Sequence, residues 1–436
     1  MCLNKEEINN APYLFDISSR IILKNNKVYR IIENKEKIFD LKSLLEDKIL
    51  KNLYDAGLVN SEIIYNDKEY MVVEHETIPF ILHPCEYTDL MFWKAAKMFV
   101  NLNLELYKSG FITHDSHPWN ISFFGKKPVF YDLGSILRGN EVSMGWFNEF
   151  FYFFMVPITL ASKKRTRKFS KEYRREHKIG FGRTLFKSKK IEDIFFRRSR
   201  SISKFRSNPE TFFKELLDWL ESHKPIKPLP KYWSNYYQPS GMDFKIPKTI
   251  KEKFVYKILK NEMPENVLDL ASNKGYFAYL AASMGANVLA MDYEDEVVDS
   301  ILEANDFSAK VTPVHMNFNE PTPSLGPALA WGNSFQRFSS DIVIAIGLIH
   351  HICITQQIPV FLFCQTIMKY AEKGIILEFV DPEDKHVKSW KKSIPKDYDI
   401  ETIKYFLKNK FPNSKIKETS KEDGVNRTFI YFSKNL

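Results

Sequence analysis

The order of apolar and polar residues predicts two regions with different architectures. In the first ninety residues, short apolar runs alternate with polar turns as β-hairpins require, and one stretch with helical spacing interrupts them. The predicted elements are a hairpin (20–32), a helix that stops near Gly57 (38–59), a second hairpin (61–76) and a long apolar helix (89–110). We therefore expect a small α+β domain here.

The middle of the chain, residues 141–230, has irregular helical patterning and ends in a Pro-rich linker at 224–233. Its most apolar run, 145–161, contains Glu149 and Pro157, so a buried helix is the primary interpretation and a membrane-surface helix the alternative. No run reaches the roughly 20 apolar residues of a membrane span.

From about residue 250 onward, predicted strands and helices alternate. The strands are expected at 267–271, 287–292, 310–317, 340–347, 374–380, 414–419 and 427–433, and the helices at 248–262, 276–285, 294–305, 355–372 and 400–411. Such alternation builds a doubly wound, mostly parallel sheet. The fold class is therefore α/β, and the length of 436 residues accommodates domains at 1–140, 141–230 and 231–436.

The loop after the first of these strands, NVLDLASNKGYF (266–277), holds one glycine, Gly275. Dinucleotide sites need several glycines, because a pyrophosphate must approach the backbone closely. S-adenosylmethionine has no phosphate, and one close approach suffices for it. The loop therefore favours this cofactor over a dinucleotide.

Polar residues at successive strand ends fit the parts of that cofactor, because ligands of such sheets bind beyond the carboxyl ends of the strands. Asp269 would lie near the ammonium group, Asp292 would accept the ribose hydroxyls, and Asn317 would bond the adenine amino group. The segment IGLIHH (346–351) would lie beside the methyl group. The predicted cofactor-binding residues are Asp269, Ala271, Ser272, Asn273, Gly275, Asp292, Asn317 and Gly347.

The sequences VLDLASNKGYF, NVLAMD and DIVIAIGLIHH resemble motifs of the class I S-adenosylmethionine-dependent methyltransferase family, with Ala271 and Asn273 in place of glycines. The resemblance implies a Rossmann-like fold and methyl transfer. His350 and His351 are candidate bases, because histidine titrates near neutrality. Glu378 at the end of the fifth strand is the other candidate. Alternatively, one of the histidines shapes the loop or caps the next helix.

In the first region, DSHPWN (115–120) and DLG (132–134) resemble the catalytic loop and the metal-binding triplet of aminoglycoside-phosphotransferase-like kinases. The resemblance implies that Asp115 orients an acceptor hydroxyl, and that Asn120 and Asp132 hold Mg²⁺.

The upstream part of a kinase is reduced here. No glycine precedes Gly57, one strand is missing, and Lys24 and Arg30 are poor substitutes for the phosphate-binding lysine. Three interpretations stay open: a degenerate kinase-like scaffold, an active kinase that uses ATP and Mg²⁺, and chance similarity.

Together the two regions resemble a bacterial family that includes rhizobial nodulation methyltransferases. They are also similar to bifunctional kinase–methyltransferases that cap polysaccharide chains, in which the methyltransferase comes first. We expect O-methylation of a cell-envelope glycan or a related small acceptor, with the kinase-like region as a scaffold. The alternatives are a bifunctional kinase–methyltransferase and a nonenzymatic scaffold that retains the cofactor fold.

The net charge of +9 is concentrated in residues 163–206, which hold 18 Lys and Arg against 4 Asp and Glu. Arg197, Arg198 and Arg200 form a candidate anion patch for an acidic glycan or a membrane surface. The alternative is a solvated loop. No RNA-binding signature is present, so a nucleic-acid partner is not expected.

Four cysteines without a CxxC pair give no indication of a zinc site, and we predict no metal site besides the kinase-like loop. The first residues lack the pattern of a signal peptide. The expected location is therefore the cytoplasm of a bacterium, with peripheral contact to the inner membrane through the basic segment.

Overall fold

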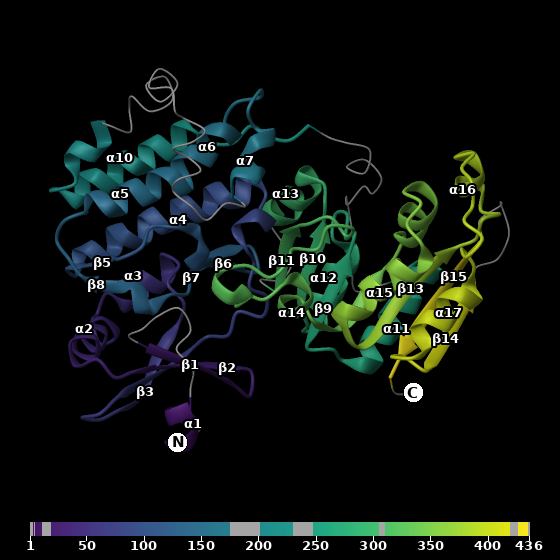
Figure 1. Cartoon of the computed structure of the whole chain (residues 1–436), viewed down its shortest axis with the longest axis horizontal. Helices are drawn as coiled ribbons and strands as arrows, with labels where there is room; N and C mark the ends of the chain where they lie inside the picture. Colours follow the sequence, from purple (N-terminus) through teal and green to yellow (C-terminus); the bar gives the residue numbers. More distant parts are fainter. Residues whose placement is uncertain are drawn as a thin grey trace. The chain divides into compact units, whose positions relative to one another are not determined.

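The computed structural model describes residues 3, 5–10, 19–174, 201–229, 247–304, 310–418 and 426–434. The chain forms two compact units (Figure 1). Unit 1 comprises residues 1–78, 83–123 and 127–227, and unit 2 comprises residues 79–82, 124–126 and 228–436. Each unit has its own sheet, and each is described by itself.

Unit 1 begins with the two predicted hairpins. They form one antiparallel sheet in the order β1-β2-β4-β3, from strands β1 (Ser19–Lys24), β2 (Lys27–Ile32), β3 (Ser61–Asn66) and β4 (Met71–His75). Asn25 and Asn26 both have positive φ angles, as a tight hairpin turn requires. The single helix expected at 38–59 is wrong: it is split into α2 (Lys35–Leu45) and α3 (Leu50–Asp55).

The centre of unit 1 is the predicted apolar helix, α4 (Asp89–Lys108), which Thr88 caps by accepting the Met91 amide. The helices α5 (Met144–Phe150), α6 (Val156–Ala161) and α10 (Pro209–Ser222) also belong to unit 1, and the Trp93 indole donates to the Leu220 carbonyl at 2.8 Å. Residues 151–155 join α5 to α6 as a π-helical turn.

The apolar run at 145–161 lies in the core of unit 1. Trp146 and Phe150 stack at 5.3 Å, and Phe99 of α4 stacks on Trp146 at 5.9 Å. The buried-helix interpretation is thus confirmed for this run. No helix in the described part of the chain combines the length and the hydropathy needed to cross a bilayer.

Two short sheets in unit 1 carry the kinase-like loop. They pair β5 (Phe111–Thr113) with β8 (Ile136–Arg138), and β6 (Ile121–Phe124) with β7 (Lys127–Phe130). The DSHPWN loop connects β5 to β6, and DLG follows β7.

Unit 2 is built on a seven-stranded sheet in the order β11-β10-β9-β12-β13-β15-β14. Its strands are β9 (Asn266–Leu270), β10 (Asn287–Asp292), β11 (Val311–His315), β12 (Ser340–Ala345), β13 (Ala371–Val380), β14 (Asn413–Glu418) and β15 (Arg427–Ser433). The first five are parallel, and β15 runs antiparallel between β13 and β14. This is the class I methyltransferase topology, as predicted.

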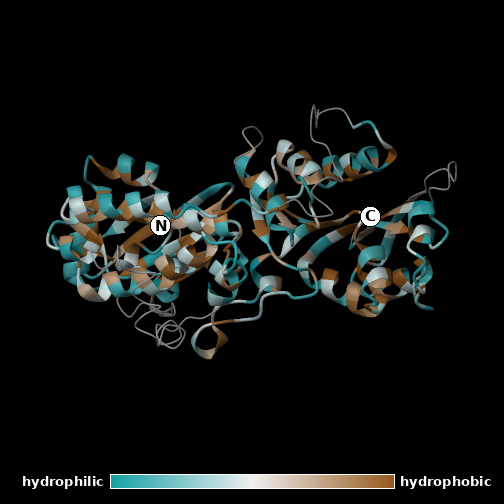
Figure 2. Cartoon of the chain, turned by 90° about the horizontal axis from the view of Figure 1, so that it is seen from above, coloured by the Kyte–Doolittle hydropathy of each residue, from teal (hydrophilic) through white to brown (hydrophobic). Residues whose placement is uncertain are grey.

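Helices connect these strands and bury their apolar residues against the sheet (Figure 1). They are α11 (Ile250–Glu262), α12 (Tyr276–Ser283), α13 (Asp295–Glu303), α14 (Ser334–Arg337), α15 (Val360–Tyr370), α16 (Lys385–Ser389) and α17 (Ile400–Lys408). In Figure 2, helices of the chain carry both hydrophobic and hydrophilic residues along their length, as helices with one buried face require. The chain begins the sheet at β9, builds outward to β11, and returns to the other side of β9 with β12. The switch point of the sheet therefore lies between β9 and β12.

Candidate active site

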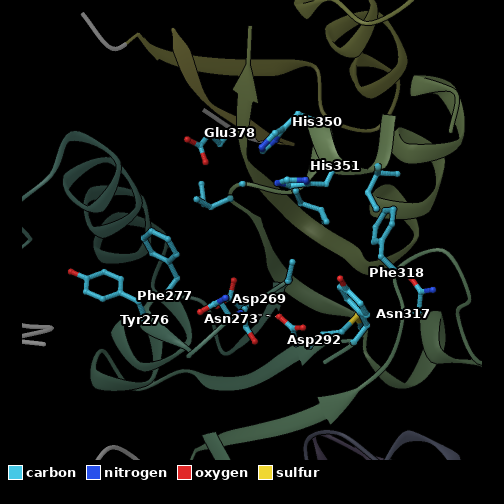
Figure 3. Close-up of a pocket in the computed structure, with 18 of the residues that line it drawn as sticks. Asp269, Asn273, Tyr276, Phe277, Asp292, Asn317, Phe318, His350, His351 and Glu378 are labelled. Atoms are coloured by element: carbon cyan, nitrogen blue, oxygen red, sulfur yellow. Dashed lines mark hydrogen bonds between the residues drawn. The ribbon is translucent and has the colours of Figure 1, made fainter. Parts of the chain in front are cut away.

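A cavity of about 350 Å³ opens in unit 2 at the ends of β9, β10, β11 and β12 (Figure 3). Its lining includes seven of the eight predicted cofactor residues, Asp269, Ala271, Ser272, Asn273, Asp292, Asn317 and Gly347, and all three predicted base candidates, His350, His351 and Glu378. The sheet thus brings together, at its switch point, side chains that are more than a hundred residues apart in the chain.

The loop between β9 and α12 has a left-handed backbone at every second position. Ala271, Asn273 and Gly275 have φ angles of 54°, 48° and 82°. Asparagine tolerates this conformation better than alanine does, and glycine adopts it without strain. A Cβ atom on Gly275 would also lie 3.0 Å from the Tyr279 ring. Gly275 does not line the cavity, so this glycine serves the turn and its packing.

The Asp292 carboxylate holds this loop in place. Its two oxygens accept the Asn273 amide and the Glu294 amide, both at 3.0 Å. Burial raises the pKa of Asp292. A carboxylate offers about four acceptor positions, so Asp292 retains capacity for the two hydroxyls of a ribose.

Asp269 is buried more completely, and its Oδ2 atom has no hydrogen-bond partner among the described residues. Burial raises the pKa of Asp269 to about 8, and the nearby charge of Asp292 acts in the same direction. The Ser272 hydroxyl, which also lines the cavity, lacks a partner as well. Because unpaired buried polar atoms are costly, these atoms indicate a polar ligand.

Asn317 lies opposite this loop, next to Phe318 (Figure 3). Its Oδ1 atom accepts the Asn319 amide at 3.1 Å and caps the turn after β11. Four aromatic residues of the lining were not predicted as part of the site, namely Tyr276, Phe277, Tyr293 and Phe318. In the sequence they read as ordinary apolar residues beside strand ends, so nothing local distinguishes them.

The three base candidates lie at the end of the cavity away from Asp292 (Figure 3). The His350 ring stacks nearly parallel on Trp390, with centroids 5.4 Å apart, and lies 4.1 Å from the His351 ring. Burial lowers the pKa of His350 to about 2 and that of His351 to about 4. Both rings are therefore neutral at physiological pH, and both are weak bases.

Glu378 on β13 belongs to a buried charge cluster that the sequence did not reveal. Arg427 on β15 donates from Nη1 to Glu378 Oε1 at 2.9 Å, and its Nε lies 3.4 Å from Asp384 Oδ2. Arg427 also lines the cavity. The Glu378 Oε2 atom and the His350 Nδ1 atom have no hydrogen-bond partner among the described residues.

The kinase-like loop in unit 1 brings Asn120 and Asp132 together, with the Asn120 amide 3.2 Å from Asp132 Oδ2. A third residue completes the group. Arg30 on β2 donates to Asp132 Oδ1 at 3.0 Å, and the Gly134 amide donates to the same oxygen at 3.1 Å. A cationic side chain thus neutralises the carboxylate that the resemblance assigns to Mg²⁺.

Asp115 lies in a different group. Asp115, His117 and Glu149 bring possible metal-ligand atoms within 4.8 Å of one another. Glu149 Oε2 already accepts the Ser116 amide at 2.6 Å. The sequence prediction missed Glu149 because it lies on α5, outside the loop motif.

The basic segment is only partly described. Arg197, Arg198 and Arg200, the predicted anion patch, lie outside the described residues. At its beginning, Arg167 and Arg174 bind the buried carboxylate of Asp89, at 2.9 and 3.2 Å. These two charges serve the packing of unit 1, so the alternative of a solvated loop does not hold for these two arginines.

No family model matches the chain. Among curated proteins, it is similar to the nodulation protein NoeA of Rhizobium meliloti (strain 1021), with 23% identity over 429 residues that cover 87% of this chain and 88% of that protein. The predicted resemblance to rhizobial nodulation proteins along most of the chain is confirmed.

Among solved structures, the chain is similar to WbdD, a bifunctional kinase-methyltransferase, at 17% identity over 45% of this chain and 42% of that chain, with a TM-score of 0.32. It thus spans less than half of the WbdD chain. It is also similar to magnesium protoporphyrin IX methyltransferase (ChlM) from Synechocystis PCC 6803 with bound SAH, at 17% identity over 42% of this chain and 81% of that chain, with a TM-score of 0.31.

Proposed function

We propose that the protein is an S-adenosylmethionine-dependent methyltransferase that methylates an oxygen atom of a cell-envelope glycan or a related small acceptor. The observation that carries the proposal is the cavity at the switch point of a class I methyltransferase sheet, with the buried Asp269 and Asp292 carboxylates at its cofactor end. Ligands of doubly wound sheets bind at this place.

The residues of the cavity fit the cofactor part by part. Asp292 has remaining acceptor positions for the ribose hydroxyls, and the unpaired Asp269 Oδ2 atom suits the ammonium group. Asn317 and Phe318 offer an amide and an aromatic ring for the adenine. When bound, the cofactor supplies a methyl group that is activated by a sulfonium. The chain contributes orientation and the exclusion of water.

The kinase-like region acts in this proposal as a scaffold that positions the acceptor. The Arg30–Asp132 ion pair supports this role, because Mg²⁺ would have to compete with a buried guanidinium for the same carboxylate. The kinase-like loop that contains Asp115 favours the bifunctional alternative. It requires Arg30 to leave Asp132 before a metal can bind.

Calorimetry with S-adenosylmethionine tests the cofactor site. The Asp292→Ala variant should lose at least about tenfold in affinity, or roughly 1.4 kcal/mol, because two charge-assisted hydrogen bonds disappear. Asp218→Ala on the exposed face of α10 is the matched control and should bind as the wild type does. A folded wild-type protein that does not bind the cofactor would instead support the nonenzymatic scaffold.

A further inference from the structure

The cavity contains a second group of polar atoms that the cofactor roles leave unused. Glu378 lines the cavity and is 1% exposed, and its buried Oε2 atom has no hydrogen-bond partner among the described residues. Gly347 lies beside it: a Cβ atom at this glycine would be 3.8 Å from Glu378 Oε2 and would touch nothing else. The glycine thus leaves space next to the unpaired oxygen.

Ion pairs hold the charged groups beside this space in place. Arg427 is the cation that binds both Glu378 and Asp384, so the cluster carries two carboxylates for one guanidinium. His350 and His351 add no positive charge, because burial keeps both rings neutral at physiological pH. The cluster therefore has a net charge of about −1, and its one unpaired oxygen accepts hydrogen bonds.

We propose that Glu378, together with His350, forms the acceptor subsite, and that the subsite takes an uncharged hydroxyl group, which donates its proton to Glu378 Oε2. The product is then a methyl ether, not a methyl ester or a methylated amine. This inference rests on the proposed function and narrows it to one class of nucleophile.

The same geometry disfavours a carboxylate and an ammonium group as the nucleophile. A carboxylate has no proton to donate, and its charge would repel Glu378 at close range in a site of low dielectric. An ammonium group would bind, but the carboxylate would stabilise its protonated form, in which nitrogen has no lone pair for attack. A hydroxyl has one proton for the one unpaired carboxylate oxygen.

The reaction balances with these residues. The hydroxyl oxygen forms a bond to the methyl carbon as the carbon–sulfur bond breaks, and sulfur keeps the electron pair and becomes a neutral thioether. The hydroxyl proton passes to Glu378 Oε2 and then to solvent. Glu378 is the catalytic residue, because its unpaired Oε2 atom lies beside the space that Gly347 leaves. Arg427 is a positioning residue, because it fixes the carboxylate.

The first test is chemical. The protein is incubated with S-adenosylmethionine that carries a labelled methyl group and with a glycan extract of the cells that make it. The label should resist dilute alkali, which cleaves esters, and should pass a cation exchanger, which retains amines. Glu378→Gln should lower labelling by at least about a hundredfold, and Glu383→Gln, an exposed neighbour, should not. Alkali-labile or retained label would overturn the inference.

The second test measures binding without turnover. Matched pairs of alcohols and carboxylic acids, such as methyl glucoside and glucuronate, are titrated into the protein loaded with S-adenosylhomocysteine, and ligand-detected NMR reports contact. The wild type should prefer the alcohol of each pair, and Glu378→Gln should lose this preference. Preference of the wild type for the acid would overturn the subsite. Absence of labelling in every fraction, despite bound cofactor, would count against methyl transfer itself.

Discussion

The carboxylates of the two candidate sites differ in burial and in hydrogen bonding. In unit 1, the Asp132 side chain is 22% exposed, and Arg30, Asn120 and Gly134 all donate hydrogen bonds to it. In unit 2, Asp269 and Glu378 are buried, each keeps one oxygen without a partner among the described residues, and both residues line one cavity. An unpaired buried oxygen costs folding free energy that a ligand can recover, whereas an oxygen that already accepts protein hydrogen bonds gains less from a ligand. The comparison therefore favours unit 2 as the unit that binds a ligand.

The largest expected effect comes from breaking the Arg30–Asp132 ion pair in unit 1. Arg30→Met should destabilise the protein by about 3 kcal/mol, because it leaves Asp132 without its cation in a largely buried place. Urea unfolding measures this loss, and the double variant with Asp132→Asn should recover most of it. Arg138→Met, which breaks an exposed pair with Asp40, is the control and should cost at most about 1 kcal/mol. Equal losses in both single variants would contradict the comparison.

The next effect is the pH dependence of cofactor binding in unit 2. Free Asp269 keeps its proton up to about pH 8, and a cationic ligand favours the ionised form. Affinity should therefore rise between pH 6 and 7.5, by at most about tenfold per pH unit. Calorimetry in buffers of different ionisation enthalpy should detect the released proton. In Asp269→Asn the slope should vanish. An unchanged slope in that variant would assign the proton to another group.

The same raised pKa has a consequence for the free protein. The unfolded chain releases the Asp269 proton near the ordinary pKa of 3.8, while the native state holds the proton up to a pKa of about 8. The native state therefore binds more protons in this window, and this group's contribution to stability falls as pH rises from about 4 to about 8. Asp269→Asn should flatten that part of the stability profile in thermal or urea unfolding.

A smaller effect concerns the strained loop. Ala271→Gly should stabilise unit 2 by less than about 1 kcal/mol, because relief of a left-handed alanine is partly offset by the flexibility of glycine in the unfolded chain. Ser272→Gly in the same loop relieves no such strain and should not stabilise. Urea unfolding separates the two. A loss of stability in Ala271→Gly would show that the backbone of Ala271 is not strained.

The smallest expected effect is none at all. ATP with Mg²⁺ should leave the melting temperature unchanged, because a ligand that binds the native state must raise it. A rise that disappears in Asp132→Ala would favour the bifunctional kinase–methyltransferase. S-adenosylmethionine serves as the positive control, since its binding to unit 2 should raise the melting temperature of the same sample.

The sequence predicted the fold of unit 2 well because its information is local. Alternating strand and helix patterns, and polar residues at strand ends, are visible in short windows. The cavity accordingly holds Asp269, Asp292 and Asn317 where the strand ends predicted them. The base candidates were also found in this way, although the structure makes His350 and His351 poor bases through burial, which periodicity does not reveal.

The residues that sequence analysis missed depend on contacts between distant positions. Arg30 pairs with Asp132 across 102 residues, and Arg427 pairs with Glu378 across 49. The sequence analysis treated Arg30 only as a poor substitute for the phosphate-binding lysine, whereas in the structure it forms an ion pair with Asp132. The split of 38–59 into α2 and α3 was missed because its apolar spacing continues through the break, where the Ile49 amide bonds the Asp47 side chain.

The position of β15 has a consequence for the kinetics of folding. This strand follows all the others in sequence, yet it inserts between β13 and β14, and it carries Arg427 to Glu378. The core of the sheet can form before β15 docks, but until then the Glu378 carboxylate lacks the Arg427 guanidinium. Pairing over such sequence separations is slow. If β15 docks late, substitutions at Arg427 should accelerate unfolding and leave the folding rate almost unchanged. The acceptor subsite would then be the last part of unit 2 to form and the first to open.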